Sequence, residues 1–196
     1  MRIISGSLKG RRFTAHSGSG VRPTSERVRE SLFSVIGNSV KGTVVLDLFS
    51  GTGALGIEAL SRGAKSVTLV EKDRKVFQNL YSFCSTLGIL DQATVMNMDA
   101  IEAIELLAIR QSKFDMIFLD PPYNSGWIHS LFCENLFLDL VAPDGFIVVE
   151  TGKVLNSATI CQSWAFEEVF SRMYGSSLLQ IFKSPKSGAN LNMESK

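Results

Sequence analysis

The residues best suited to chemistry are Asp120-Pro121-Pro122-Tyr123, which directly follow the apolar residues 116–119. An apolar run of this kind predicts a buried strand, so the four residues are expected where a strand leaves a sheet. In open α/β sheets, ligands bind at that edge. The Asp120 carboxylate and the Pro121 carbonyl could accept both N–H bonds of an exocyclic amine, while the Tyr123 ring stacks on the base that carries it. The two prolines restrict the backbone and would keep these acceptors in place.

This arrangement suits the transfer of a methyl group to nitrogen. An exocyclic amine is a poor nucleophile because its lone pair is delocalised into the ring. Accepting both of its hydrogen bonds draws the nitrogen towards tetrahedral geometry. A sulfonium methyl donor releases a neutral leaving group, so alignment supplies much of the rate, and Asp120 is not required as a base. In an arbitrary sequence, the same residues could be only a proline-rich turn at the end of a strand.

A glycine-rich stretch after the first expected strand predicts a cofactor site. Gly51, Gly53 and Gly56 follow residues 44–46 in the spacing GxGxxG. Such a turn lets a ligand approach the backbone and offers unpaired N–H groups at a helix N-terminus. Both dinucleotides and S-adenosylmethionine bind on turns of this kind. Asp47, four residues before the first glycine, favours S-adenosylmethionine, because a carboxylate suits its methionine ammonium and would repel a pyrophosphate.

Further acidic residues follow the next two expected strands. Glu71, with Lys72 beside it, stands where a carboxylate can bind ribose hydroxyls, which fits both cofactors. Asp99 and Ala100 follow the third strand, where a carboxylate can accept from an adenine amino group. Asp99 also precedes a helix, so a helix cap explains it nearly as well. For Asp47 and Glu71 together, ligand binding is the better explanation.

These motifs lie on a strict alternation of expected strands and helices. We expect strands at residues 44–46, 67–70, 94–96, 116–119 and 146–149. We expect helices at residues 24–36, from the glycine turn to residue 63, and at 73–88, 101–109 and about 127–141. The alternation predicts an α/β fold, a doubly wound and mostly parallel sheet of the Rossmann-like type with helices on both faces. Its first and fourth strands should adjoin at the switch point. Residues 166–172 and 178–183 predict a C-terminal antiparallel hairpin.

Length and composition fit one domain, because 45% of the 196 residues are hydrophobic. We divide the chain into a basic N-terminal extension with a helix (residues 1–38), the domain that would bind S-adenosylmethionine (39–183) and a disordered tail (184–196). The absence of a long apolar run argues against a membrane span, and the basic start argues against a signal peptide. Three separate cysteines suggest free thiols in a reducing cytoplasm, and with only two histidines no metal site is expected.

Positive charge is concentrated near the start of the chain. Residues 1–30 contain seven basic residues and two acidic ones, a net charge of +5, so the total of +1 leaves −4 for the remainder. The basic residues are Arg2, Lys9, Arg11, Arg12, Arg22, Arg27 and Arg29. This asymmetry predicts either an arm that meets a polyanion or a solvated end without a partner, and charge alone does not separate the two.

Together, these motifs resemble those of class I S-adenosylmethionine-dependent amino-methyltransferases. More closely, residues 1–183 resemble the bacterial small-subunit ribosomal RNA guanine-N2 methyltransferases. The most specific likenesses are to that family's first two blocks, at residues 1–11 and 22–33. The glycine turn, residues 120–123 and residues 174–175 are similar to its later blocks.

The resemblance implies a seven-stranded sheet and methylation of one guanine amino group in 16S ribosomal RNA, within the small ribosomal subunit or its assembly intermediate. By default we expect a monomer. Target-base contacts would be Asp120, Pro121, Pro122 and Tyr123, and cofactor contacts Asp47, Phe49, Gly51, Gly53, Glu71, Lys72, Asp99 and Ala100. Phe49 stands where many general methyltransferases have another glycine. Four residues could hold RNA phosphates: Arg11, Arg12, Arg22 and Arg27. Arg22 and Arg27 could instead pair with Glu26 or Glu30 on the helix surface.

Three other functions would use part of the same pattern. A DNA adenine-N6 methyltransferase shares the amine chemistry but usually needs extra sequence to read DNA, and the chain has no insertion of that size. A nicotinamide-dependent oxidoreductase would explain the glycine spacing alone, but Asp47 and residues 120–123 argue against it. A non-catalytic RNA-binding assembly factor that retains the fold is disfavoured by Asp120 and Tyr123, although the sequence leaves it open.

Overall fold

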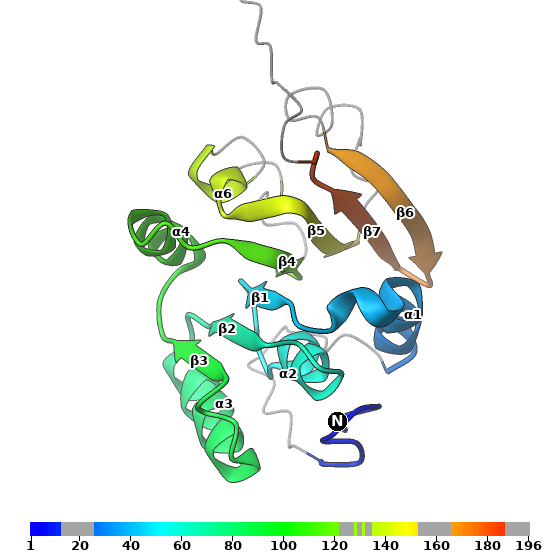
Figure 1. Cartoon of the computed structure of the whole chain (residues 1–196). Coiled ribbons are helices and arrows are strands. Elements are labelled where there is room, and N and C mark those ends of the chain that lie inside the picture. Colours follow the sequence, from blue (N-terminus) through cyan, green and yellow to red (C-terminus); the bar gives the residue numbers. More distant parts are fainter. Residues whose placement is uncertain (13–25, 122–127, 129–130, 132–134, 153–165, 187–196) are drawn as a thin grey trace, which may run out of the picture.

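A seven-stranded sheet forms the centre of the structure, a computed structural model that describes residues 1–12, 26–121, 128, 131, 135–152 and 166–186 (Figure 1). The strand order is β3-β2-β1-β4-β5-β7-β6. The strands are β1 (Val44–Asp47), β2 (Ser66–Val70), β3 (Ala93–Met96), β4 (Phe114–Leu119), β5 (Val141–Thr151), β6 (Glu167–Tyr174) and β7 (Ser177–Lys183). The first five pair in parallel, and β7 is antiparallel to both β5 and β6. The predicted fold class, including the C-terminal hairpin, is confirmed.

The switch point of the sheet lies between β1 and β4, as the sequence predicts. Asp47 of β1 pairs with Leu69 of β2 on one side and with Phe118 of β4 on the other. Both central strands are apolar runs buried on their two faces, the pattern of parallel strands covered by helices. The glycine turn after β1 and the residues after β4 therefore leave the sheet side by side.

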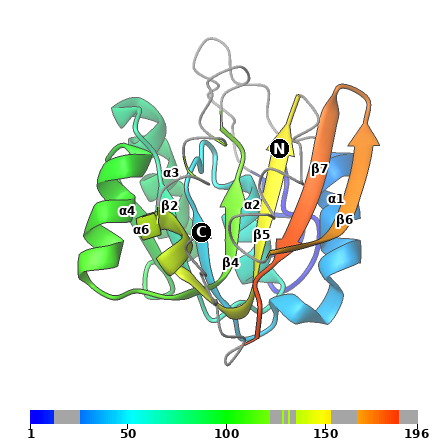
Figure 2. The same cartoon turned by 90° about the horizontal axis from the view of Figure 1, so that it is seen from above.

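Helices cover both faces of this sheet (Figures 1 and 2). One face carries α1 (Glu26–Ile36), α2 (Ala54–Ser61) and α3 (Arg74–Leu87), and the other carries α4 (Ala100–Ile109) and α6 (Asn135–Asp139). A short 3-10 turn, η1 (Gly37–Val40), follows α1. Leu32, Phe33 and Ile36 recur at helical spacing, so α1 buries one face against the sheet.

One helix was predicted to extend further along the chain than it does. The local pattern predicts a helix over about residues 127–141, but α6 ends at Asp139 and β5 begins at Val141. Val141 pairs with Phe114 of β4, a partner that is distant in the sequence. Val141 therefore belongs to the sheet, although the local apolar periodicity assigns it to the helix. Earlier in this predicted helix, residues 128 and 131 are helical, and its other residues before 135 lie outside the described part of the chain.

The hairpin of β6 and β7 forms one edge of the sheet. Gly175, with a φ of +63°, lies in its tight turn. The pairing of the two strands is irregular between Glu168 and Phe170, where the register skips Val169. At the other end of β6, Tyr174 forms a hydrogen bond through its hydroxyl with Ser31 of α1.

The N-terminal segment (residues 1–12) folds back on itself and packs on α2 (Figure 1). Ile3 N donates to the Arg11 carbonyl at 3.0 Å, and Gly10 N donates to the Ile3 carbonyl at 2.9 Å. Ile3 is 1% exposed and belongs to the same apolar cluster as α1 and α2. The predicted disordered tail begins too early, because Ser184 is buried and its N donates to the Gly145 carbonyl at 2.8 Å; residues 187–196 lie outside the described chain. None of the described helices is long and apolar enough to cross a membrane.

Candidate active site

Four acidic side chains gather along one edge of the sheet. Asp47 ends β1, and Glu71 and Asp120 directly follow β2 and β4. Asp99 follows β3 after a short connection. Because these strands are parallel and adjacent in the order β3-β2-β1-β4, all four acids belong to the edge where the strands end. The structure therefore brings together the acidic residues that the sequence singles out.

The glycine turn (residues 47–56) is held to the strands on both sides of β1. Leu48 N donates to a carbonyl of β4 at 3.2 Å, and Ser50 N donates to a carbonyl of β2 at 3.0 Å. Gly53 N donates to the Ser50 carbonyl at 2.7 Å, and Gly53, with a φ of +78°, directly precedes α2. The turn therefore directs the N-terminus of α2, where helix geometry favours negative charge, towards the edge that carries the acids.

The three glycines of this turn have different surroundings. A Cβ at Gly53 would lie 2.5 Å from Leu80 Cδ1, and one at Gly56 would lie 2.4 Å from Leu69 Cδ2. A Cβ at Gly51, where φ is +51°, would have no described atom within 4 Å. Packing therefore explains two of the glycines. The third borders open space, where a ligand could lie against the backbone.

Asp47 lies beneath the glycine turn and is only 1% exposed. Its Oδ2 accepts a hydrogen bond from Gly56 N at 3.1 Å, and Phe49 N–H supports the same carboxylate. Burial raises the pKa of Asp47 to about 7, and the charge of Glu71 contributes to the rise. Among the described residues, no lysine or arginine forms an ion pair with it. Its negative charge would therefore gain from a cationic group on a ligand.

Glu71 supports the turn from β2. Its Oε2 accepts from Gly51 N at 2.9 Å and its Oε1 from Asp73 N at 2.7 Å. Burial raises the pKa of Glu71, although these backbone donors oppose the rise. A carboxylate oxygen has two acceptor positions, so both oxygens can still take a hydrogen bond from a ligand hydroxyl.

Asp99 is a helix cap with a charged neighbour. Its Oδ1 accepts from Ile101 N at 3.0 Å, and Glu102 accepts from Asp99 N at 3.0 Å, which completes a capping box at the start of α4. Lys72 Nζ lies 2.9 Å from Asp99 Oδ2, and this hydrogen bond is the main cause of the lowered pKa of Asp99. Ala100 is the buried first residue of α4. The sequence allowed Asp99 to be a helix cap or an adenine contact. The helix cap is present, and the adenine contact stays a prediction.

Asp120 and Pro121 lie just beyond β4, between β1 and β5. Phe118 pairs with Asp47, and Leu119 pairs with Val149 of β5, so Asp120 lies two residues beyond the pairing with the glycine-turn strand. Asp120 is partly exposed and Pro121 is buried. The predicted contacts from residues 122 and 123 lie outside the described chain.

The predicted RNA-binding residues that the structure describes lie at the surface of the N-terminal segment and of α1. Arg11 and Arg12 are exposed, as is Arg27, whereas Arg22 lies outside the described chain. Glu26, which the sequence offered as a partner for Arg27, instead forms an ion pair with Arg2 at 3.1 Å.

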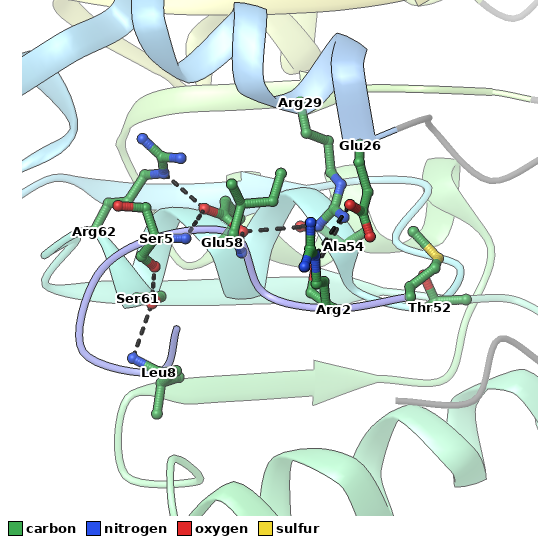
Figure 3. Close-up of polar contacts among 12 residues, drawn as sticks. Arg2, Ser5, Leu8, Glu26, Arg29, Thr52, Ala54, Glu58, Ser61 and Arg62 are labelled. Carbon is green, nitrogen blue, oxygen red and sulfur yellow. Dashed lines mark hydrogen bonds and ion pairs between the residues drawn. The ribbon is translucent and has the colours of Figure 1, made fainter. Parts of the chain in front are cut away.

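A buried ionic cluster that the sequence motifs did not predict lies between α1 and α2 (Figure 3). Arg29 and Glu58 have side chains that are 0% exposed, and Arg29 Nη1 lies 3.7 Å from Glu58 Oε2. Arg62 Nε donates to Glu58 Oε1 at 2.7 Å. Burial lowers the pKa of Arg29, and the charge of Glu58 opposes that shift. A signal was available, because Arg29 stands between Val28 and Leu32 on the apolar face of α1.

Known proteins resemble this chain over most of its length. The family model described as Conserved hypothetical protein 95 matches residues 1–183. Ribosomal RNA small subunit methyltransferase D of Haemophilus influenzae is 39% identical over 157 residues, which cover 78% of this chain and 79% of the relative. The protein of the same name from Escherichia coli is 36% identical over 167 residues, which cover 84% and 81%.

A solved structure extends the likeness to the fold. A hypothetical protein of Thermus thermophilus is 25% identical, with a TM-score of 0.77 and coverage of 95% of this chain and 99% of that one. The resemblance inferred from the sequence motifs is confirmed by the relatives. The chain belongs to the family described as Conserved hypothetical protein 95 and is a homologue of bacterial small-subunit ribosomal RNA methyltransferases.

Proposed function

We propose that this chain transfers a methyl group from S-adenosyl-L-methionine to the exocyclic N2 amine of a guanine in 16S ribosomal RNA. One observation carries the proposal: the glycine turn after β1 and Asp120 with Pro121 after β4 adjoin at the switch point of the sheet. A donor held on one strand end and an amine held on the next can be aligned for in-line transfer. The names of the relatives support ribosomal RNA as the substrate class. The choice of guanine N2 is supported by the sequence motifs.

The residues of the glycine turn fit S-adenosylmethionine, which supplies an electrophilic methyl group when it is bound. Gly51 leaves space against the backbone that a Cβ would fill. Asp47 places a buried negative charge, without a described cationic partner, beneath the position proposed for the methionine ammonium. Glu71 and Asp99 stand at successive strand ends, as ribose and adenine contacts would require. Their neighbours at this edge, proposed to line the site, are Phe49, Gly53, Lys72 and Ala100.

Asp120 and Pro121 would hold the amine. The carboxylate of Asp120 and the carbonyl of Pro121 accept its two N–H bonds and direct the nitrogen lone pair at the methyl group. After transfer, Asp120 or water takes the proton that the nitrogen loses. Tyr123, following Pro122, would stack on the base. The guanine must be unstacked or flipped out to reach these residues.

The exposed basic residues would meet the RNA backbone. Arg11 and Arg12 lie at the surface of the N-terminal segment, and Arg27 lies on α1. Together with Arg22, they would bind phosphates without reading sequence. The substrate would be 16S ribosomal RNA within the small subunit or its assembly intermediate, modified by a monomer in the cytoplasm.

The product identifies the reaction. Purified protein is incubated with labelled S-adenosylmethionine and, in parallel, with unmodified small ribosomal subunits, naked 16S ribosomal RNA and DNA. Digestion and chromatography of the nucleosides should yield N2-methylguanosine from RNA. N6-methyladenine from DNA would contradict the proposal, and RNA binding without any methylated product would point to an assembly factor.

The role of Asp120 can be tested separately from cofactor binding. Asp120→Ala should reduce turnover by about a hundredfold or more, because the amine loses a charged acceptor in the transition state. The dissociation constant for S-adenosylhomocysteine should change by less than about twofold. Asp91→Ala is the matched control. Asp91 is an exposed residue before β3, so it lies where the parallel strands begin, at the end of the sheet away from the proposed site. An equal loss of cofactor affinity in Asp120→Ala would assign this residue to the cofactor instead.

A further inference from the structure

The N-terminal segment and the glycine turn meet at one buried guanidinium (Figure 3). Arg29 Nη2 donates to the Arg2 carbonyl at 3.0 Å, and Arg29 Nη1 donates to the Ala54 carbonyl at 3.4 Å. Arg2 belongs to the N-terminal segment, and Ala54 is the first residue of α2, directly after Gly53. Arg29 is 0% exposed, so water does not compete for these acceptors. One side chain of α1 therefore fixes the segment and the turn relative to each other.

Glu58 fixes the same segment from α2. Its Oε2 accepts from Ile4 N at 2.8 Å, and its Oε1 accepts from Ser5 N at 3.0 Å. Figure 3 shows the segment passing close to this carboxylate, with Arg29 approaching from α1. Hydrogen bonds from backbone N–H groups to a buried carboxylate are strong and directional, and Arg29 balances the charge.

Gly6 allows the segment to approach α2 closely. It has a φ of +86°, and a Cβ there would lie 1.7 Å from the Ser61 carbonyl oxygen. Ser7 N donates to that same oxygen at 2.8 Å. Gly10, in the same segment, has a φ of +83°, but a Cβ there would have no described atom within 4 Å. The two glycines therefore have similar backbone requirements, and only Gly6 is needed for docking.

The docked segment has one end at the turn and basic side chains at the other. Met1 Sδ lies 3.6 Å from Thr52 Oγ1, within the glycine turn. The exposed side chains of Lys9, Arg11 and Arg12 belong to the same segment. A ligand that orders the basic side chains therefore acts on backbone that is hydrogen-bonded, through Arg29, to the start of α2.

We propose that Arg29 is a positioning residue through which RNA bound at the N-terminal segment and the cofactor bound at the glycine turn strengthen each other's binding. This proposal rests on the function proposed above. The residual motion of Arg29, Arg2 and Ala54 that one bound ligand suppresses need not be suppressed again, so the second ligand loses less conformational entropy when it binds. The coupling must be reciprocal, so it can be measured from either ligand.

The measurement is a coupling factor. S-adenosylhomocysteine, which cannot be turned over, is titrated by calorimetry with and without a saturating amount of the RNA or subunit that the wild type methylates. The coupling factor is the ratio of the two dissociation constants. We expect about tenfold tighter binding with RNA present, within the usual range for allosteric coupling. A wild-type factor of one would overturn the proposal.

Two variants and two matched controls locate the coupling. Arg29→Lys keeps the charge but loses the planar fork that reaches both carbonyls, and Gly6→Ala displaces the segment without altering α1 or the turn. Both should reduce the coupling factor to below about two. Arg62→Gln and Gly10→Ala should retain it, because Arg62 contacts the same carboxylate without holding the segment. Equal coupling in Gly6→Ala and Gly10→Ala would overturn the proposal.

Hydrogen exchange in the wild type gives a test that needs no variant. S-adenosylhomocysteine alone should slow exchange of the Ile4 and Ser5 amides, which donate to Glu58. Unchanged exchange at both amides would also overturn the proposal, even where a variant fails to fold. Failure of the proposed function is distinguishable, because the wild type would then not methylate ribosomal RNA. Methylation with a coupling factor of one would overturn only the inference about Arg29.

Discussion

Asp47, at the end of β1, and Glu58, in α2, are both buried carboxylates, but they have opposite surroundings. Glu58 has two arginines and two backbone N–H groups around it. Asp47 accepts from backbone N–H groups of the glycine turn, without an ion pair among the described residues, and its pKa is raised to about 7. A buried charge with cationic partners fixes structure, whereas one without them is costly until a ligand supplies the cation. The difference distinguishes Glu58, which holds structural elements in position, from Asp47, which is proposed to bind a ligand.

Removal of Glu58 should have the largest effect on stability. Glu58→Ala leaves Arg29 buried without its counter-charge, so we expect a loss of about 3–5 kcal/mol in the free energy of unfolding. Urea unfolding measures this change. Arg62→Gln is the control, because Arg62 is partly exposed and its ion pair should be worth about 1 kcal/mol or less. Equal losses in the two variants would mean that the Arg29–Glu58 pair does not hold the structure together.

Two glycines of the turn should differ in the same way as the two acids: Gly56 should matter mainly for stability, and Gly51 mainly for ligand binding. Gly56→Ala forces a Cβ to within 2.4 Å of Leu69 Cδ2 and 3.2 Å of Asp47 Oδ2, so we expect a loss of stability of about 1–3 kcal/mol. Gly51→Ala meets open space, so only its positive φ should cost stability, about 1–2 kcal/mol. It should nevertheless weaken S-adenosylhomocysteine binding tenfold or more. Thermal melts and calorimetry on both variants test this, and unchanged affinity in Gly51→Ala would place the ligand elsewhere.

Asp47→Asn should separate binding from stability. An amide oxygen can still accept from Gly56 N, and a neutral side chain avoids burial of a charge, so stability at pH 7 should be unchanged or higher. Affinity for S-adenosylhomocysteine should fall about tenfold, because the ammonium loses its counter-charge. Denaturation and titration of the same preparation provide both values. A loss of stability as large as that of Glu58→Ala would make Asp47 a structural residue.

The raised pKa of Asp47 also predicts a pH dependence of stability. The folded-state pKa of Asp47, about 7, lies above its ordinary value of 3.8, so the folded protein retains a proton that the unfolded chain releases between these values. This contribution to stability is therefore present below about pH 4 and is lost as pH rises to about 7. Melting temperatures between pH 4 and 8 should show a decline that Asp47→Asn lacks. Affinity for S-adenosylhomocysteine should rise over the upper part of the same range, and a parallel decline in both proteins would exclude Asp47 as the source.

Sequence alone predicted the elements whose signals are local. Apolar runs separated by helical stretches predicted the sheet, and the chain order predicted that β1 and β4 adjoin. The helix predicted before β5 was too long at its end. Val141 pairs with Phe114 of β4, and no local sequence pattern indicates a pairing with a strand so distant in the sequence. Arg29 and Glu58 were missed because charged helix residues are usually at the surface. Their burial depends on three segments that meet only in the fold.

Similar limits applied within the candidate site. The GxGxxG spacing marked the turn but treated its glycines alike, whereas their neighbours differ. Asp99 illustrates a second limit, because a cap and a ligand contact require the same residue at the same place. The sequence therefore predicted the position of the candidate site better than the role of each residue in it.

The irregular pairing at Val169 has a consequence for the behaviour of the protein at high concentration. β6 is the last strand of the sheet, and an outer strand offers its free backbone edge to any second chain that can pair with it. An extra residue bends such a strand and interrupts the regular ladder that pairing requires. The bulge should therefore discourage sheet-to-sheet aggregation. A deletion of Val169, which would straighten β6, should lower the solubility of the folded protein.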